Sequence, residues 1–423
     1  MIEKASYTST HMVISALLKL SLLLTLIPFS IWNHAPSVGL ACAVGLSAWL
    51  LLTQKSEPLV TSDWIVILGL SAVPICTAMG LLIHDDSLWV FDRPSRLLLA
   101  VPVFLAIRIV GARAQTLTQA AGWSAMVFGL IALWERLHGV DRVIGQTGHP
   151  IIFGNVALLM ALICLAGLLS REKSSKAFHT GLLVIGLVSG VMASLASGSR
   201  GGWLFALPIA AMLFLGNPRP SPNPLKTLAI SGVVGALVLM IFGPQIMDRL
   251  HPVWQGILFA LQSDTPPPNE LLSVVARIDM WREAITAWTQ SPWIGIGPDH
   301  FLATLENRAR LGFMEPGRAH AHNEVLTQAA WFGVLGLLGL LALTICISYT
   351  FRQFYILEAR IGLVVLWTFL LFGLTDSMFS MMNRVELYAV LLAVCAGACR
   401  HAQLHQESER RESQASHAGH CQA

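Results

Sequence analysis

Two histidines near the end of a long polar interval are the best candidates for acid–base chemistry in this chain. His320 and His322 lie in the sequence AHAHNE, and His322 directly precedes Asn323 and a long apolar run. Histidine exchanges protons near neutral pH, so we predict that His322 is a general base acting on a hydroxyl group, with His320 and Asn323 in support. A position at a helix N-terminus would keep the imidazole neutral, because the helix dipole disfavours the charged form.

Two other roles remain open for these histidines. His322 or Asn323 could cap the helix that follows. The histidine pair could also hold zinc with one further ligand, for which the candidates are Asp299, His300 and Glu324. The sequence has no HExxH motif and no CxxC pair, so we expect neither a metal ion nor another cofactor.

Arginines in the polar connections form the second chemical feature. Arg200 lies in SGSRGGW, an almost loop-free junction where glycines permit a sharp turn. Arg277 and Arg282 lie in the long polar interval. A guanidinium group binds phosphate or carboxylate through two parallel hydrogen bonds, so we predict that these three arginines bind an anionic ligand. The alternative is pairing with nearby carboxylates or, for Arg200, with helix-end carbonyls.

An apolar repeat at helical spacing predicts an amphipathic helix around Arg277 and Arg282. The repeat is formed by Leu271, Val274, Val275, Ile278, Trp281, Ile285 and Trp288. Arg277 falls at the edge of this stripe and Arg282 nearer its middle, and spacing alone does not decide which one faces a ligand. The sequence SPWIGIGPDHF then predicts a turn and a second helix through about Leu311.

Asp376 lies close to the end of a predicted membrane span. An ionisable side chain at such a depth is costly and is commonly functional. We expect it either to orient a catalytic histidine or to pair with an arginine of the site. A purely structural pair with Arg384 is the alternative.

The elements that must position these residues are transmembrane helices. The 423 residues are 55% hydrophobic and only 12% charged, with a mean hydropathy of +0.64. Apolar runs predict an all-α, polytopic membrane bundle of about twelve transmembrane helices, with ends uncertain by several residues. The predicted spans are 12–32, 37–53, 63–83, 94–111, 115–135, 149–169, 178–197, 201–216, 225–243, 323–349, 358–378 and 385–400.

The domain organisation follows from these spans. Helices one to nine occupy residues 1–243, and a periplasmic loop with amphipathic helices occupies residues 244–322. Helices ten to twelve occupy residues 323–400. The remaining residues, 401–423, form a polar cytoplasmic tail that we expect to be disordered.

The distribution of lysine predicts the orientation in the membrane. Every lysine falls on the side of the chain's N-terminus, and the lysines are Lys4, Lys19, Lys55, Lys173, Lys176 and Lys226. The positive-inside rule makes that side cytoplasmic, which puts the long loop outside. The net charge of +3 is too small to suggest nucleic acid as a partner. The 7 cysteines are expected to pack as small apolar side chains.

Four sequence features together resemble the bacterial O-antigen ligase family, within the wider O-antigen ligase and polymerase superfamily. These features are GSRGGW, ARIDMWREA, the SPWIGIGPDHF turn, and His322-Asn323 followed after nine residues by Gly333-Val-Leu-Gly336. They span roughly residues 197–340. The chain departs slightly from the pattern in having His320 two residues before His322, which leaves the histidine assignment open.

The resemblance implies a glycosyltransferase of the bacterial inner membrane with its active site on the periplasmic face. Its partners would be undecaprenyl-diphosphate-linked O-antigen as donor, the lipid A–core oligosaccharide as acceptor, and membrane lipids. By position, Arg200 and Arg277 would hold the diphosphate and His322 would activate the acceptor hydroxyl, without a metal ion.

Three rival functions remain open. An O-antigen polymerase would use the same donor with a second lipid-linked glycan as acceptor. A protein O-oligosaccharyltransferase is less favoured, because such enzymes tend to carry a larger C-terminal periplasmic region. A transporter is disfavoured because the polar residues concentrate at one face rather than at the bilayer midplane.

Overall fold

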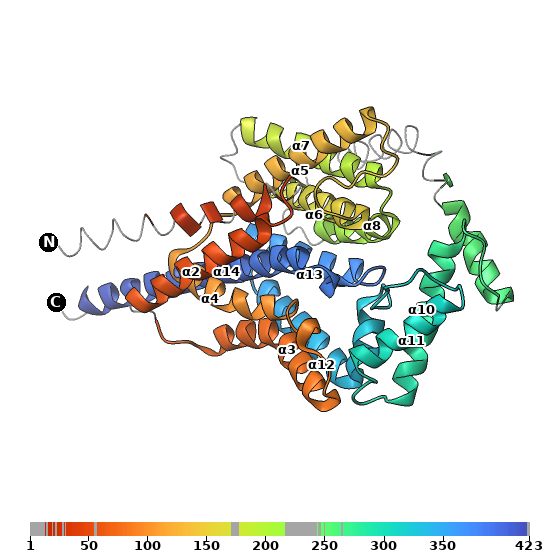
Figure 1. Ribbon diagram of the computed structural model, residues 1–423. Coiled ribbons are helices and arrows are strands. Elements are labelled where there is room, and N and C mark those ends of the chain that lie inside the picture. Colours follow the sequence, from red (N-terminus) through yellow and green to blue (C-terminus); the bar gives the residue numbers. More distant parts are fainter. Residues whose placement is uncertain are drawn as a thin grey trace.

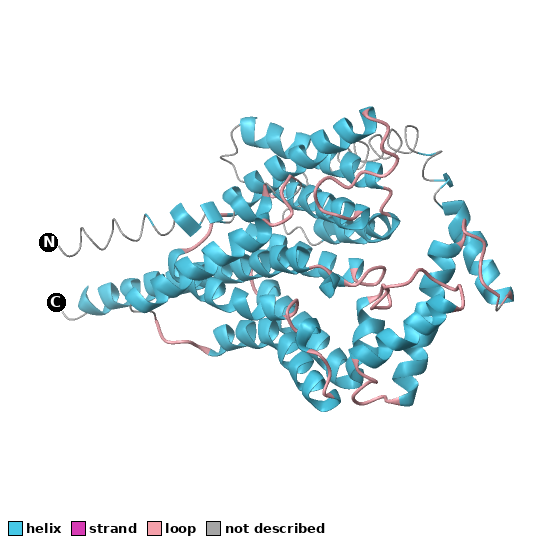
Figure 2. Cartoon of the chain, in the orientation of Figure 1, coloured by secondary structure: helices cyan, strands magenta, loops and turns pink. Residues whose placement is uncertain are grey.

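The fold is known from a computed structural model, and its described part consists of helices and the loops between them (Figure 2). The structure describes residues 31–54, 57–170, 177–215, 250–263 and 265–420, together with scattered residues before 31 and between 243 and 248. Within these ranges no β-strand occurs. The all-α fold predicted from the apolar runs is therefore confirmed for the described part of the chain.

The helices form one bundle with α10 and α11 at one end and the C-terminal part of α14 extending from the other (Figure 1). Two short 3₁₀ turns, Leu88–Val90 and Met378–Ser380, lie in the loops. The main helices are α2 Ala35–Thr53, α3 Thr61–His84, α4 Ser95–Val110, α5 Ala114–Leu137, α6 Pro150–Leu169, α7 Ala177–Ser197, α8 Arg200–Leu215, α10 Leu272–Gln290, α11 Pro298–Arg310, α12 Glu324–Arg352, α13 Leu357–Phe372 and α14 Met382–His420. Residues 250–262 are also helical.

Within the described residues, 7 helices are long and apolar enough to cross a membrane. They are α2, α3, α5, α6, α7, α12 and α14, and the chain is thus a multi-pass membrane protein. The predicted spans 94–111, 201–216 and 358–378 correspond to α4, α8 and α13, each of 16 residues. A helix of that length rises only about 24 Å, less than the hydrocarbon core of a bilayer.

The remaining two predicted spans cannot be compared with the fold. Span 225–243 falls outside the described residues except at its last position, and span 12–32 falls partly outside them. The prediction of twelve transmembrane helices is therefore not confirmed, and the structure supports a multi-pass helical bundle without fixing that number.

Two predicted boundaries differ from the structure in ways that matter. The predicted span 358–378 ends at Phe372, and residues 373–381 form an irregular loop that carries Asp376. The tail predicted to be disordered continues α14 as helix to His420. Pairs on adjacent turns support that extension, namely Gln403 with Glu407 and His405 with Glu409.

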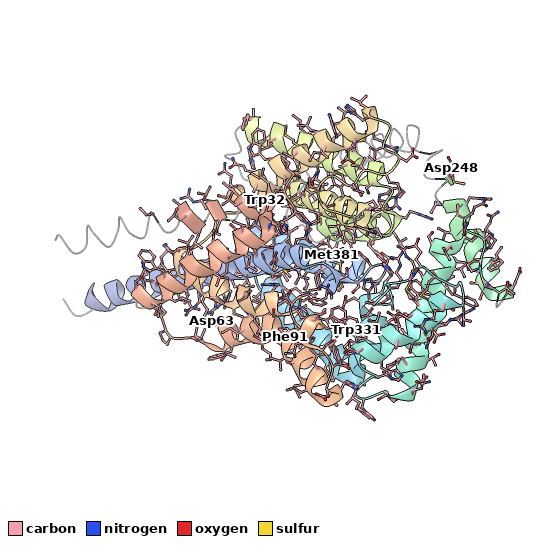
Figure 3. All side chains as sticks on the ribbon, viewed as in Figure 1. Trp32, Asp63, Phe91, Asp248, Trp331 and Met381 are labelled. Atoms are coloured by element: carbon pink, nitrogen blue, oxygen red, sulfur yellow. The ribbon has the colours of Figure 1, made fainter. Side chains whose placement is uncertain are left out.

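The long polar interval folds over the end of the bundle with an apolar core of its own. Ala276, Met280 and Ala284 of α10 pack with Phe301 of α11 and with Phe332 of α12. Figure 3 shows Trp331, another member of this core, where α12 meets α10 and α11, while Asp63 lies near the far end of α3. We call α10, α11 and the loops that join them to α12 the cap.

The cap is fastened to α12 by a break in that helix. Gly333 has φ 58° and ψ −141°, so α12 consists of a short first segment and a longer second one. The chain 292–297 lies against the break and pairs with it by backbone hydrogen bonds: Ile296 N–H to Ala330, Gly297 N–H to Trp331 and Val334 N–H to Pro292. These contacts satisfy the groups that the break frees, and they explain why SPWIGIG and Gly333 occur together.

Replacing Gly333 by alanine should destabilise the protein by about 1–3 kcal/mol, since the residue is in a backbone region that side chains avoid. An added Cβ would lie 2.5 Å from the Pro292 carbonyl oxygen and 2.6 Å from the Ile294 nitrogen. Thermal unfolding of the purified protein measures the effect. Gly45→Ala is the matched control, because nothing lies within 4 Å of its added Cβ. Equal unfolding temperatures for the two variants would contradict this account of the break.

The orientation in the membrane stays a prediction, because every lysine on which it rests lies outside the described residues. We expect a reporter active only in the cytoplasm to be silent when fused near Pro267, and one active only in the periplasm to work there. An active cytoplasmic reporter at Pro267 would reverse the topology. A fusion after α14 is the control and should give the opposite pair of signals.

Candidate active site

His322 occupies a special backbone position at the start of α12. Its φ is 49°, a left-handed conformation that is uncommon for residues other than glycine, and its side chain is buried. The next residue, Asn323, is the N-cap, because its side chain accepts a hydrogen bond from the Leu326 N–H at 3.1 Å. Asn323 also donates to the Leu374 carbonyl at 3.1 Å. The cap role thus belongs to Asn323, and His322 is left to project from the helix end.

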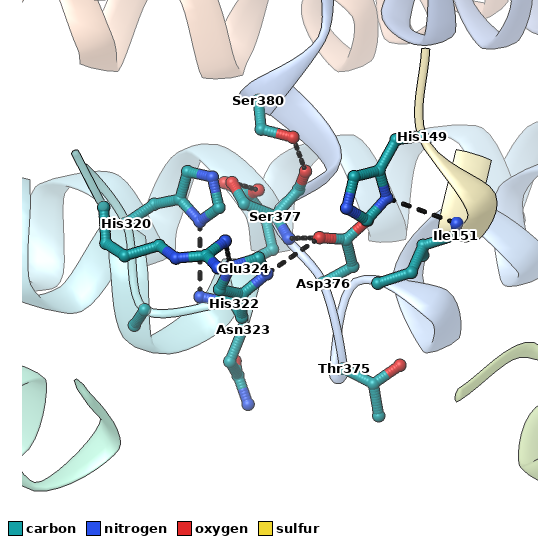
Figure 4. A network of polar contacts seen from close by, with 12 residues as sticks. His149, Ile151, His320, His322, Asn323, Glu324, Thr375, Asp376, Ser377 and Ser380 are labelled. Carbon is teal, nitrogen blue, oxygen red and sulfur yellow. Dashed lines mark hydrogen bonds and ion pairs between the residues drawn. The ribbon is translucent and has the colours of Figure 1, made fainter. Parts of the chain in front are cut away.

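The imidazole of His322 is held by a chain of buried charged groups (Figure 4). Its Nδ1 lies 3.2 Å from Asp376 Oδ1, and the other carboxylate oxygen of Asp376 accepts from Arg384 Nη1 at 2.5 Å. Burial acts to raise the pKa of Asp376, but the charge of Arg384 and the hydrogen bond from His322 outweigh it. The pKa of Asp376 therefore lies well below its usual range. Asp376 both orients His322 and pairs with Arg384, so the two contacts considered from the sequence occur at the same time.

His320 lies against His322 but is a weaker candidate for a base. The two rings are 4.5 Å apart and meet edge to face, and His320 Nδ1 accepts from the His322 backbone N–H at 3.4 Å. Burial, with help from the charges of His322, Arg384 and Arg318, lowers the pKa of His320 to about 3. A ring that holds a proton so weakly is a poor general base at neutral pH.

Glu324 fixes the loop that carries Asp376, a role that the sequence did not suggest. It is buried and accepts hydrogen bonds from Ser377 Oγ at 2.9 Å, from Gln328 Nε2 at 2.9 Å and from the Phe379 N–H at 3.3 Å. Its own N–H donates to the Gly373 carbonyl at 2.6 Å. The first turn of α12 therefore binds residues 373–379 directly.

Arg200 is the first residue of α8, after the turn that SGSRGGW predicts. Gly198 has φ 68°, and Ser199 Oγ donates to the Pro150 carbonyl at 2.7 Å, so the turn packs on the start of α6. Gly201 lies directly against the loop of Asp376, because an added Cβ there would be 2.1 Å from Thr375 Oγ1. The helix end that carries Arg200 is thus brought beside residues 375 and 376.

Arg277 and Arg282 face different surroundings on α10. They are five residues apart and point about 140° away from each other around the helix. Arg282 is exposed and donates to the Ala260 carbonyl. Among the residues that the structure describes, Arg277 has no hydrogen-bond or ion-pair partner. Its pKa is lowered chiefly by burial, the charge of Asp376 acting to raise it and that of Arg318 to lower it further.

The helix predicted around Arg277 and Arg282 is confirmed as α10, Leu272–Gln290, and its buried face coincides only in part with the apolar stripe. Val275 of the stripe is buried, with 5% exposure. Ala276, Met280, Ala284 and Ala287 are buried, whereas Ile285 of the stripe is 48% exposed. The small alanine side chains let α10 approach α11 and α12 closely, which decides the orientation over the bulkier stripe.

His149 lies in the group of charged side chains around Asp376 and His322 (Figure 4), and sequence reasoning missed it. It is the N-cap of α6, and its Nδ1 accepts from the Ile151 N–H at 3.2 Å (Figure 4). Burial lowers the pKa of His149, and the charges of Asp376, Arg142 and His322 also act on it. The sequence TGHP before an apolar run carries the same signal as HN before α12, namely a histidine at a helix start.

Two of the further ligands considered for a zinc ion, Asp299 and Glu324, are engaged in other contacts, and His300 is exposed. Asp299 accepts from Ser87 Oγ at 3.0 Å and from Trp89 Nε1 at 3.3 Å, and Glu324 binds the 373–379 loop. In the described part of the chain, no three His, Cys, Asp or Glu side chains are grouped so that they could hold a metal ion.

Comparison with known proteins finds a family that part of this chain resembles. Residues 185–341 match the family model described as O-antigen ligase. This match supports membership of the O-antigen ligase superfamily. An uncharacterized protein of Haemophilus influenzae is similar to it, with 28% identity over 310 residues that cover 71% of this chain and 73% of the relative.

The residues of the charged cluster lie only partly within the matched stretch. The matched stretch contains Arg200, Arg277 and His322, whereas Asp376 and His149 lie outside it. Members of this superfamily are glycosyltransferase-like membrane enzymes. The charged cluster of this chain is therefore built partly from segments outside the matched stretch.

Proposed function

We propose that this protein is an O-antigen ligase of the bacterial inner membrane that works on the periplasmic side. It transfers a glycan from undecaprenyl diphosphate to the lipid A–core oligosaccharide. The observation that carries the proposal is that two unlike groups interact with Asp376: His322, which this ionised carboxylate orients, and Arg277, a partly buried cation with no partner among the described residues. The first suits a general base and the second an anionic leaving group.

The reaction assigned to these groups is a single displacement. The acceptor hydroxyl oxygen bonds to the anomeric carbon of the donor sugar as its proton passes to His322 Nε2. The bond from that carbon to the diphosphate oxygen breaks, and undecaprenyl diphosphate leaves with the electron pair. Arg277 and Arg200 neutralise the leaving group, and Asp376 stabilises the imidazolium that forms. Arg384 keeps Asp376 ionised and in place.

A ligase and a polymerase differ in the acceptor of the glycan. The lipopolysaccharide profile of a deletion strain shows which acceptor is used. We expect loss of all long chains on the lipid A–core, with full-length lipid-linked glycan accumulating. A polymerase would instead leave single repeats attached to the core. Complementation with the wild-type chain should restore the profile, and complementation with His322→Ala should not.

A further inference from the structure

The reactive nitrogen of His322 is covered in this structure by a side chain with no assigned role. Since a carboxylate only accepts hydrogen bonds, the contact with Asp376 puts the ring proton of His322 on Nδ1 and the lone pair on Nε2. Arg318 Nη1 lies 3.4 Å from that Nε2, and a guanidinium group only donates. The lone pair that would accept the hydroxyl proton is therefore already occupied.

Arg318 is held there by contacts that are easily replaced. Its second contact is an ion pair with Glu315, three residues earlier in the same loop. The side chains of Arg318 and Glu315 are 34% and 63% exposed, and exposed pairs of this kind contribute little stability. The intervening Gly317 has φ 78°, so the loop is built on a residue that allows more than one backbone path.

The surroundings of Arg277 indicate where the Arg318 side chain would move when an anion binds. The charge of Arg318 acts on Arg277 and disfavours its charged form, and no carboxylate is bound to Arg277 among the described residues. Two like charges held near each other are unfavourable until an anion lies between them. A diphosphate bound to Arg277 would therefore attract Arg318 more strongly than the imidazole of His322 does.

We propose that Arg318 is a substrate-operated cover for the general base: binding of the diphosphate donor draws Arg318 away from His322 Nε2 and onto the phosphate, which frees the base for the acceptor hydroxyl. This inference rests on the proposed function and adds an order to it. The donor binds first, and His322 becomes competent only in its presence. Arg318 is then both a donor-binding residue and a positioning residue for the base.

Chemical labelling of the full-length protein tests the cover. Diethyl pyrocarbonate reacts with an unprotonated imidazole nitrogen, and mass spectrometry of the peptide containing His322 measures the rate. Without donor, His322 should react several times faster in Arg318→Ala than in the wild type. Arg310→Ala is the matched control, because it removes an exposed arginine of the same cap and should leave the rate unchanged. Equal rates in Arg318→Ala and wild type would overturn the cover.

Binding of undecaprenyl diphosphate without glycan tests the second part of the proposal, that Arg318 moves onto the phosphate. Loss of one charge-assisted hydrogen bond to phosphate should weaken binding by about 10-fold or more in Arg318→Ala, with no change in Arg310→Ala. Faster labelling with unchanged affinity would overturn the coupling, since Arg318 would then only shield the ring. Neither measurement needs glycan transfer. Negative results here, alongside a His322→Ala protein that cannot ligate, would remove the cover and leave the proposed function standing.

Discussion

His322→Ala should slow glycan transfer by about 10²–10⁴-fold, the usual contribution of a general base. A sugar hydroxyl is a very weak acid and needs to lose its proton as its oxygen bonds to the anomeric carbon. The diphosphate already activates the donor, so the base is the main group that the protein must add. Transfer from purified lipid-linked donor to lipid A–core, measured with purified protein, gives the rate.

The structure supplies the control for this experiment. His320 touches His322, yet its pKa of about 3 makes it an ineffective base, so His320→Ala should lose much less activity. Binding of undecaprenyl diphosphate should persist in both variants, which separates loss of chemistry from loss of folding. A near wild-type rate for folded His322→Ala would remove His322 as the base.

Arg277→Ala should reduce transfer by roughly 30- to 1000-fold, as expected when a charge-assisted contact to a developing anion is lost in a partly desolvated site. Lysine at this position should rescue poorly, because an ammonium group cannot form two parallel bonds to a diphosphate. The rate of transfer at saturating acceptor, together with the affinity for undecaprenyl diphosphate, measures the effect.

Arg282→Ala is the matched control on the same helix. Its guanidinium donates to the Ala260 carbonyl, so the variant should change activity little and affect chiefly the packing of residues 250–262 against α10. If Arg282→Ala were the crippling change and Arg277→Ala silent, the assignment of the diphosphate to Arg277 would be wrong.

Features that depend on neighbouring residues were readable from the sequence. Apolar runs predicted α2, α3, α5, α6, α7, α12 and α14, because a membrane helix satisfies its backbone groups within its own segment. The helix start at Asn323 and the turn at Arg200 were readable for the same reason, since caps and tight turns involve only a few adjacent positions.

Features that join distant segments were decided by the tertiary structure. Asp376 is 54 positions from His322, and its loop replaces the end of a predicted span, so the sequence left its partner open. Spacing could not choose between Arg277 and Arg282 either, because periodicity fixes only the angle between side chains on a helix. Close packing of α10 through its alanines against α11 and α12 leaves Arg282 exposed and Arg277 partly buried, where the charge of Asp376 acts on it. The sequence thus determined which groups are present and in which helices, and long-range packing determined which of them meet.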